Sequence, residues 1–410
     1  MAAKKRQHEK KPAKAAAAPA HEKKPAKAAA AAAPAAAASR GAPYGVLAAA
    51  VVAVVVGLAA LDPGYTTAPL AGSQAARTAL SARINETLAH ASVHEVSFES
   101  QGVACHGWFF APKVGGGGAA TPVVVMGHGF AGQKDQGLAK YADVFAGRGI
   151  ASLAIDYRTF GGSGGAPRHV VDPPGHAQDL VAAALHVLRG GDAAVAAAGV
   201  TPRSKLGVWG SSMGGGHALV AAAALGDLAS AVVSQMPMLD GFANSKFNIV
   251  TKGLLASLRL AAVSLHDMAR GALGLEPARV AAYAALGDLG VMNLPDSELA
   301  SYYAKHPSDG HYLGDWENKV CARTLLKIKD YRPLLLVPAI KAPVCFLRPG
   351  NDIVLPNDIV LEAKALARHP KSILHQFDAD VGHFHVYREA FPEAARVQAD
   401  FLVDALLSAS

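Results

Sequence analysis

From about residue 92 onward, short apolar segments alternate with longer helical segments. Short apolar runs indicate buried strands, and longer periodic runs indicate helices. We expect strands at 92–100, 103–111, 122–127, 150–157, 206–209, 230–236, 342–350 and 372–377. We expect helices near 137–148, 175–188, 357–368 and 388–408, and directly after the strand at 206–209. Such alternation predicts an α/β fold, with a mainly parallel sheet covered by helices on both faces and an antiparallel pair formed by the first two strands.

The strand at 206–209 leads into Gly210-Ser211-Ser212-Met213-Gly214, which fits the G-x-S-x-G pattern. This pattern places a serine on a sharp turn between a strand and a helix, where glycines two residues away on either side allow the backbones to approach each other. The run of small and helix-forming residues that follows supplies the helix. Ser212 is therefore the candidate covalent nucleophile.

A second match to the pattern lies at 161–165 and has Ser163 at its centre. It sits in a glycine-rich stretch that runs to Pro167 rather than between a strand and a helix. We interpret it as a mobile loop that lies near the site at most.

A serine nucleophile needs a histidine base, and the histidine needs a carboxylate to orient it. After a strand–turn–helix nucleophile the expected chain order is serine, acid, histidine. Asp352 follows the strand at 342–350 and His383 follows the strand at 372–377, so these two are the candidate acid and base. Asp240 remains the alternative acid. The neighbouring residues that we assign to loop, strand or packing positions are Asp378, Asp380, His375, His385 and His217.

Backbone N–H groups that bind the oxyanion contribute about 3 kcal/mol each to transition-state stabilisation. One donor is expected to be Met213, directly after the nucleophile, and the other Phe130, in the loop after the strand at 122–127. Phe130 is favoured because Gly129 lets the chain turn there. His128 is expected to brace this loop by hydrogen bonding rather than to act as a second base.

Between about 238 and 341 the alternation of strands and helices is interrupted, and we interpret this stretch as a cap insertion. Its aromatic side chains either line an apolar pocket over the nucleophile or form the cap's own core. They are Phe242, Phe247, Tyr283, Tyr302, Tyr303, Tyr312, Trp316 and Tyr331.

Taken together, the motifs resemble those of the α/β-hydrolase superfamily over about residues 93–408. They are MGHGF at 126–130, DYRTFGGSGG at 156–165, GSSMGGGH at 210–217, PGNDIVLP at 349–356 and VGHFHVY at 381–387. The chain looks most like bacterial-type domains grouped as dienelactone-hydrolase-like, X-prolyl dipeptidyl-peptidase-like and serine-aminopeptidase-like. The resemblance implies an α/β-hydrolase fold and the triad roles given above. Two departures are a serine in place of the cysteine of true dienelactone hydrolases, and His385 where an acidic residue is expected.

Residues 1–43 form a basic tail rich in alanine, lysine and proline, in which HEKKPAKA at 8–15 recurs at 21–28. Residues 1–40 carry a net charge of +8 against +7 for the whole chain, so the remainder is close to −1. We therefore expect no nucleic-acid-binding domain. The tail is expected to be disordered, because this composition buries too little surface to offset chain entropy.

An uncharged segment at 44–61 is just long enough to cross a bilayer. We interpret it as a transmembrane or signal-anchor segment with the catalytic domain on the lumenal or extracellular side. A cleaved secretory or organelle-targeting signal is the alternative. Residues 62–91 are expected to form a linker, and Asn85 lies in a glycosylation sequon.

The cysteines Cys105, Cys321 and Cys345 have no metal-ligand spacing, and their odd number argues against a disulfide framework. No metal or cofactor is expected. The sequence therefore predicts a serine hydrolase of residues 92–410 that cleaves a carboxylic ester of a small-molecule or acyl substrate through an acyl-enzyme. The alternatives are a peptidase or thioesterase on the same triad, or a non-catalytic binding protein of the same fold.

Overall fold

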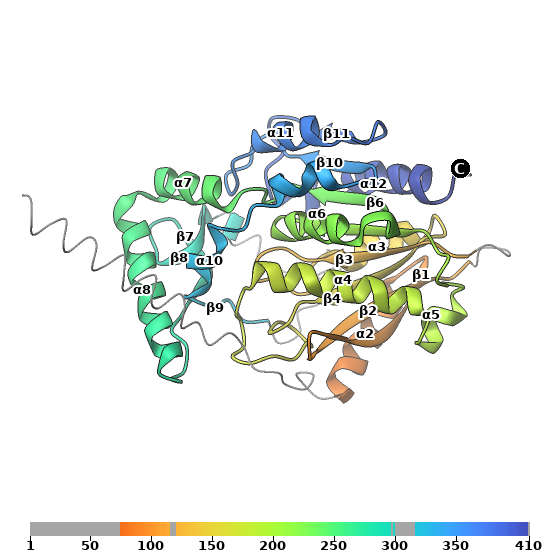
Figure 1. Cartoon of the computed structure of the whole chain (residues 1–410), viewed down its shortest axis with the longest axis horizontal. Coiled ribbons are helices and arrows are strands. Elements are labelled where there is room, and N and C mark those ends of the chain that lie inside the picture. The colour runs from red at the N-terminus through yellow and green to blue at the C-terminus, as the bar shows by residue number, and fades with distance from the viewer. Residues whose placement is uncertain (1–73, 115–119, 297, 300–315, 409–410) are drawn as a thin grey trace, which may run out of the picture. The chain divides into compact units, whose positions relative to one another are not determined.

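The computed structural model describes residues 74–114, 120–296, 298–299 and 316–408. Its main sheet has eight strands in the order β1-β2-β4-β3-β5-β6-β10-β11. β1 pairs antiparallel with β2, and β2 pairs antiparallel with β4, whereas the other neighbours are parallel. The α/β class, the mainly parallel sheet and the antiparallel opening pair are confirmed (Figure 1). The strands are β1 (Ala91–Ser100), β2 (Val103–Pro112), β3 (Val123–Gly127), β4 (Ala151–Asp156), β5 (Leu206–Ser211), β6 (Ala229–Gln235), β10 (Val344–Arg348) and β11 (Ile373–Gln376).

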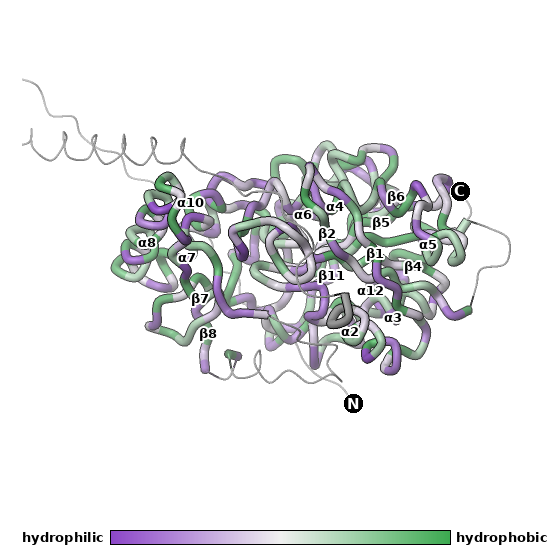
Figure 2. The backbone as a smooth tube through the Cα atoms, turned by 90° about the horizontal axis from the view of Figure 1, so that it is seen from below, coloured by the Kyte–Doolittle hydropathy of each residue, from purple (hydrophilic) through white to green (hydrophobic). Residues whose placement is uncertain are grey.

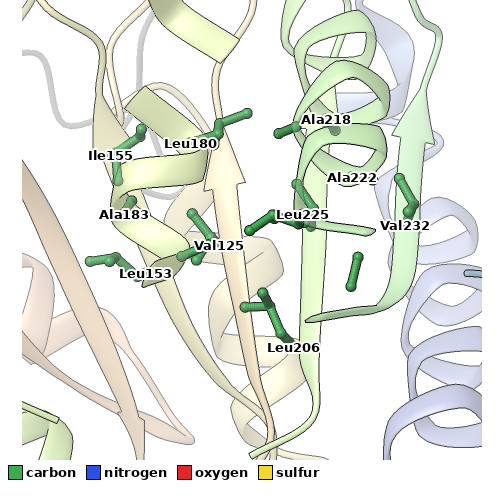
Figure 3. Packing of buried hydrophobic residues seen from close by; sticks show 14 of the residues in the cluster. Val125, Leu153, Ile155, Leu180, Ala183, Leu206, Ala218, Ala222, Leu225 and Val232 are labelled. Carbon is green, nitrogen blue, oxygen red and sulfur yellow. The ribbon is translucent and has the colours of Figure 1, made fainter. Parts of the chain in front are cut away.

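Helices cover both faces of this sheet, because successive side chains of a buried strand point to opposite faces. On one face Val125 of β3 belongs to an apolar cluster with Leu180 of α4 (Figure 3). On the other face Met126 belongs to a cluster with Phe145 of α3. The helices of the first face are α4 (Pro173–Arg189), α6 (Met213–Leu225) and α11 (Ile359–Leu366), and those of the second are α2 (Gln74–Thr87), α3 (Leu138–Ala146) and α12 (Phe391–Leu406).

The residues at the two ends of α4 explain where this helix begins and ends. Pro173 and Pro174 occupy the first turn, where a missing backbone N–H leaves no intrahelical bond unmade. The helix ends at Gly190, whose φ of 67° lies in the left-handed region that favours glycine. The short helix α5 (Ala193–Ala197) then leads towards β5.

The expected cap insertion lies between β6 and β10, two strands that pair directly in the main sheet. Its described residues contain three α-helices, one 3-10 helix and a small sheet in the order β8-β7-β9. Hydrophobic and hydrophilic residues follow one another along its helices (Figure 2). The elements of the cap are α7 (Gly241–Lys252), α8 (Leu254–Ala272), β7 (Arg279–Ala285), β8 (Gly290–Leu294), β9 (Val320–Cys321), α10 (Thr324–Ile328) and the 3-10 helix η3 (Pro333–Ala339).

The structure differs from the expected linker over 62–91, because residues 74–87 form α2. Ile84 in this helix is fully buried and Leu88 just after it is nearly so, and both pack with the core of the second sheet face. The folded domain therefore begins before β1. The predicted tail at 1–43 and the apolar segment at 44–61 lie outside the described residues and stay predictions.

Within the described ranges, no helix has both the length and the apolar character needed to cross a membrane.

Asn85 is exposed on α2, and its side-chain oxygen accepts a hydrogen bond of 3.2 Å from the backbone N–H of Val93. Cys105, Cys321 and Cys345 are all buried free thiols, and burial raises their pKa values above the ordinary range.

A buried ion pair joins the strand and helix layers of the first face. The Arg158 guanidinium donates from Nε to Asp179 Oδ1 at 2.9 Å and from a terminal nitrogen to Ser100 Oγ at 2.8 Å. The side chains of Arg158 and Asp179 are at most 1% exposed. Burial is the largest influence on the pKa of Asp179 and raises it, while the guanidinium lowers it. Each charge of this buried pair is therefore compensated only while the other residue is present.

We expect Arg158→Met to lower the free energy of unfolding by about 3–5 kcal/mol, because the Asp179 carboxylate is left buried without a partner. The matched control is Arg148→Met, which breaks a pair with Asp400 whose side chains are 44% and 49% exposed. That change should cost less than about 1 kcal/mol. Urea unfolding measures both losses, and equal losses would contradict the prediction.

Candidate active site

Ser212 lies on the turn between β5 and α6 with φ 57° and ψ −121°, a conformation that costs energy for a residue with a Cβ. The flanking glycines make this turn possible. A Cβ on Gly210 would overlap the carbonyl of Gly214. A Cβ on Gly214 would lie 2.6 Å from the carbonyl oxygen of Gly127 and would overlap that of His128. The strand–turn–helix arrangement expected for Ser212 is therefore present.

The structure brings the predicted triad side chains together. His383 Nε2 lies 3.1 Å from Ser212 Oγ, and His383 Nδ1 lies 2.8 Å from Asp352 Oδ2. The other carboxylate oxygen of Asp352 accepts backbone hydrogen bonds from Val354 at 2.8 Å and Leu355 at 2.9 Å. An ionised Asp352 accepts from Nδ1–H, so the Nε2 of a neutral His383 is left to accept the serine proton.

The alternative acid Asp240 has a structural role instead. Its carboxylate accepts from the backbone N–H of Ala243 at 2.9 Å and so caps the start of α7. It also accepts from Arg332 Nε at 2.7 Å. Asp240 is thus held at the base of the cap, whereas Asp352 contacts the histidine.

The other histidines and acids near the triad have partners elsewhere. His375 Nε2 lies 2.9 Å from Glu393 Oε1. His385 Nδ1 accepts from the backbone N–H of Gly382 at 3.1 Å. The backbone carbonyl of Asp378 accepts from Val381 N–H at 3.1 Å and so shapes the loop before His383.

Ser163 lies in the loop after β4, as expected, but its side chain is built into the sheet. Its side chain is fully buried, accepts from His106 N–H of β2 at 2.9 Å and donates to Asp156 O of β4 at 2.6 Å. The hydroxyl therefore links β2 to β4, and both of its hydrogen bonds go to backbone groups. The glycines around it suggested mobility because sequence gives no sign that β2 passes beside this loop.

Phe130 and Met213, the expected oxyanion donors, are both buried in one apolar cluster beside Ser212. Met213 is the first residue of α6, a position whose backbone N–H has no partner within the helix. A Cβ on Gly129 would lie 3.2 Å from Ser212 Cβ, so the loop that carries Phe130 passes directly over Ser212. These positions are compatible with the expected role of the two amides.

His128 braces this loop, as expected. Its Nδ1 lies 2.9 Å from Gly129 O, and a carbonyl oxygen only accepts, so Nδ1 carries the proton. Burial lowers the pKa of His128 to about 4, which keeps the ring neutral near pH 7.

A polar network behind the Ser212 turn was not predicted from the sequence. The hydroxyls of Ser211 and Tyr387 are hydrogen-bonded, and Gln235 Nε2 donates to Ser211 Oγ at 2.9 Å. Tyr387 lies four residues after His383 in the chain. The network therefore ties the histidine loop to the nucleophile turn, and only the fold brings these residues together.

Some aromatic residues of the cap pack against the loops around Ser212, and one is exposed. Tyr283, Trp316 and Tyr331 pack in the apolar cluster with Phe130 and Met213, so they cover the loops around the nucleophile. Phe242 is 53% exposed. Tyr302, Tyr303 and Tyr312 lie outside the described residues.

A cavity of about 590 Å³ lies between the cap and the loop that carries Asp352. Phe247, Met292 and Val354 give it apolar walls, and Lys252 gives it one amine. The Lys252 ammonium donates to the carbonyl of Val291, and burial lowers the pKa of this lysine to about 8. The part of the chain that the structure describes contains no group of three histidine, cysteine or acidic side chains placed to hold a metal ion.

Known proteins resemble this chain in sequence and in fold. Residues 118–285 match the family model of the serine aminopeptidases, S33. The chain is 35% identical over 310 residues to the quorum-quenching protein AidA of Acinetobacter baumannii, which covers 75% of this chain and 93% of that protein. It is 24% identical over 291 residues to thiohydrolase aneE of Aspergillus aculeatus, which covers 71% and 87%.

Among solved structures, the α/β hydrolase GrgF from Penicillium superposes with a TM-score of 0.62 at 23% identity, covering 77% of this chain and 99% of that one. The hypothetical protein PA2218 of Pseudomonas aeruginosa gives the same TM-score and identity, covering 78% and 95%. The chain belongs to the α/β-hydrolase superfamily, and its relatives support a hydrolytic activity.

Three buried histidines surround Tyr157 beneath the site. The Tyr157 ring stacks on His176 with centroids 4.6 Å apart and makes edge contacts with His128 at 4.4 Å and His217 at 5.3 Å. Burial lowers the pKa of His217 to about 3 and that of His176 well below its ordinary value. His217 also lies 2.8 Å from the Tyr331 hydroxyl of the cap.

We expect the free energy of unfolding to fall between pH 7 and pH 4. In the unfolded chain these histidines have a pKa of about 6.5 and become protonated over this interval, whereas the buried histidines of the folded protein stay largely neutral. His217→Gln should lose about 2–3 kcal/mol less than the wild type over this interval. The exposed His266→Gln is the control. Denaturant unfolding across this pH range measures the effect, and parallel curves for His217→Gln and the wild type would refute it.

Proposed function

We propose that this protein is a serine hydrolase that cleaves a carboxylic ester through an acyl-enzyme. The observation that carries the proposal is the placement of His383 between Ser212 Oγ, at 3.1 Å, and Asp352 Oδ2, at 2.8 Å. Both His383 and Asp352 side chains are at most 3% exposed. Burial of the pair strengthens the electrostatic interaction that stabilises an imidazolium.

In the proposed reaction, Ser212 Oγ attacks the acyl carbonyl carbon while its proton passes to His383 Nε2. The tetrahedral intermediate collapses as the C–O bond to the alcohol breaks and His383 returns the proton to the leaving oxygen. Water then attacks the acyl-enzyme with His383 as base, which releases the carboxylic acid and restores the Ser212 hydroxyl. Asp352 keeps Nδ1 protonated throughout.

The backbone N–H groups of Phe130 and Met213 are proposed to bind the oxyanion. Their support is positional, because Met213 begins α6 and the Phe130 loop passes over Ser212. The partial positive charge at a helix N-terminus adds to the stabilisation of an anion there.

An apolar substrate suits the surroundings of the site. The loops beside Ser212 share one apolar cluster with the cap, and the cavity next to the Asp352 loop has mainly apolar walls. Thioester hydrolysis is the second candidate, because the relative aneE is named a thiohydrolase. Both reactions use the same acyl-enzyme.

We expect a fluorophosphonate probe to label the wild type and not Ser212→Ala. Ser163→Ala is the matched control, because that hydroxyl is buried away from the triad, and it should keep the label. Intact-protein mass spectrometry measures the adduct. Turnover of p-nitrophenyl esters, the matching thioesters and aminoacyl nitroanilides then ranks the substrate classes. An unlabelled, folded wild type would support the non-catalytic alternative.

We expect Asp352→Asn to lower kcat for the preferred ester by about 10³- to 10⁴-fold, because an asparagine amide favours the wrong tautomer of His383. Asp240→Asn is the control, and it should change kcat by less than about threefold because Asp240 contacts the cap and not the histidine. Steady-state kinetics at constant pH distinguish the two acids. A larger loss in Asp240→Asn would reverse the assignment.

A further inference from the structure

The loop over the nucleophile presents three consecutive backbone carbonyls, those of Gly129, Phe130 and Ala131, and each one is held by a hydrogen bond. Gly129 O accepts from the domain itself, from His128 Nδ1 at 2.9 Å and from Gly132 N–H at 3.2 Å. The next two carbonyls accept from the cap. The Tyr283 hydroxyl donates to Phe130 O at 2.9 Å, and Trp316 Nε1 donates to Ala131 O at 2.8 Å.

The two cap donors are fixed relative to each other. Tyr283 N–H donates to Asn318 Oδ1 at 2.9 Å, and Asn318 Nδ2 donates back to Tyr283 O at 2.8 Å. Trp316 is two residues from Asn318 in the chain, and the rings of Tyr283 and Trp316 have centroids 6.1 Å apart. Tyr283 is also buried and packs on Phe384, the neighbour of His383. The two donors thus belong to one hydrogen-bonded and packed unit.

These hydrogen bonds bear directly on the direction of the Phe130 N–H. In a trans peptide the C=O and N–H point in opposite directions, so the groups that hold Gly129 O aim the Phe130 N–H to the other side. The next two peptides, whose carbonyls belong to Phe130 and Ala131, must keep their orientation if the Phe130 N–H is to keep its direction. Ala131 has a φ of 52°, an uncommon conformation for alanine that the surroundings must hold.

We propose that Tyr283 and Trp316 are positioning residues that let the cap set the geometry of the oxyanion site. The inference rests on the proposed function, because it assigns the Phe130 N–H to the oxyanion. The cap therefore does more than cover the substrate. It supplies two of the donors that hold the loop in the conformation required for the transition state.

The test compares Tyr283→Phe and Trp316→Phe with Tyr331→Phe in the full chain. Tyr331 is a buried cap tyrosine whose hydroxyl lies 2.8 Å from His217, so its variant keeps the ring in the apolar cluster and loses a similar hydrogen bond between cap and domain, but no hydrogen bond to the Phe130 loop. We expect the first two variants to lower kcat for a p-nitrophenyl ester by about 10- to 100-fold, with KM within about twofold. Tyr331→Phe should stay within about threefold in kcat.

A second measurement separates positioning from stability. An alkyl trifluoromethyl ketone forms a tetrahedral oxyanion with the serine, so its Ki should rise in Tyr283→Phe by the same factor by which kcat/KM falls. A purely structural role would lower Tm in all three variants and leave Ki unchanged. If Tyr283→Phe does not fold, Trp316→Phe gives the same comparison.

The outcomes for the inference and for the proposed function are distinct. An active wild type whose Tyr283→Phe and Trp316→Phe variants match Tyr331→Phe in kcat and Ki overturns the inference alone. A folded wild type with neither ester turnover nor probe labelling at Ser212 overturns both. Selective loss of kcat and of inhibitor affinity in the two loop-contacting variants supports the inference.

Discussion

The close contact between the start of α6 and the end of β3 is the constraint on which the site depends. Gly127 and Gly210 lie opposite each other in the parallel register of β3 and β5, and Gly214 lies against the carbonyls of Gly127 and His128. No side chain fits between these backbones. The contact places the Ser212 turn and the Phe130 loop at a fixed separation, and the strained conformation of Ser212 is held by it.

Much of the domain could be predicted from its sequence because the relevant signals are local. The sequence indicates where strands end, in which order the motifs follow one another and where turns occur. These signals predicted that Ser212, Asp352 and His383 lie at the ends of three strands. The helix α2 was also accessible, since Leu80, Ile84 and Leu88 recur at the four-residue spacing of a helix face. The expectation of a linker over 62–91 did not use this spacing.

The features that sequence could not supply join distant parts of the chain. The Tyr283 hydroxyl meets a carbonyl 153 residues away in sequence, and Tyr387 meets Ser211 across 176 residues. A tyrosine in a strand has the same local pattern whether its hydroxyl faces solvent, the cap's own core or a loop. The burial of Ser163 was misjudged for the same reason, because glycine content describes the conformational freedom of a loop and not what packs on it.

The cap enters after β6 and leaves before β10, and these strands are hydrogen-bonded neighbours. Because β6 and β10 are parallel, the chain must return from the carboxyl ends of the strands to their amino ends, and the segment that contains η3 makes this return. The two ends of the cap meet before it, where Gly241 N–H donates to Tyr331 O and Leu334 N–H donates to Leu239 O, each at 2.9 Å. Such an insertion can diverge or be exchanged as a module without disturbing strand order. Because β7 brings Tyr283 to the Phe130 loop, however, an exchanged cap would bring new hydrogen-bond partners to this loop. If the loop holds the oxyanion as proposed, selectivity and turnover would change together rather than separately.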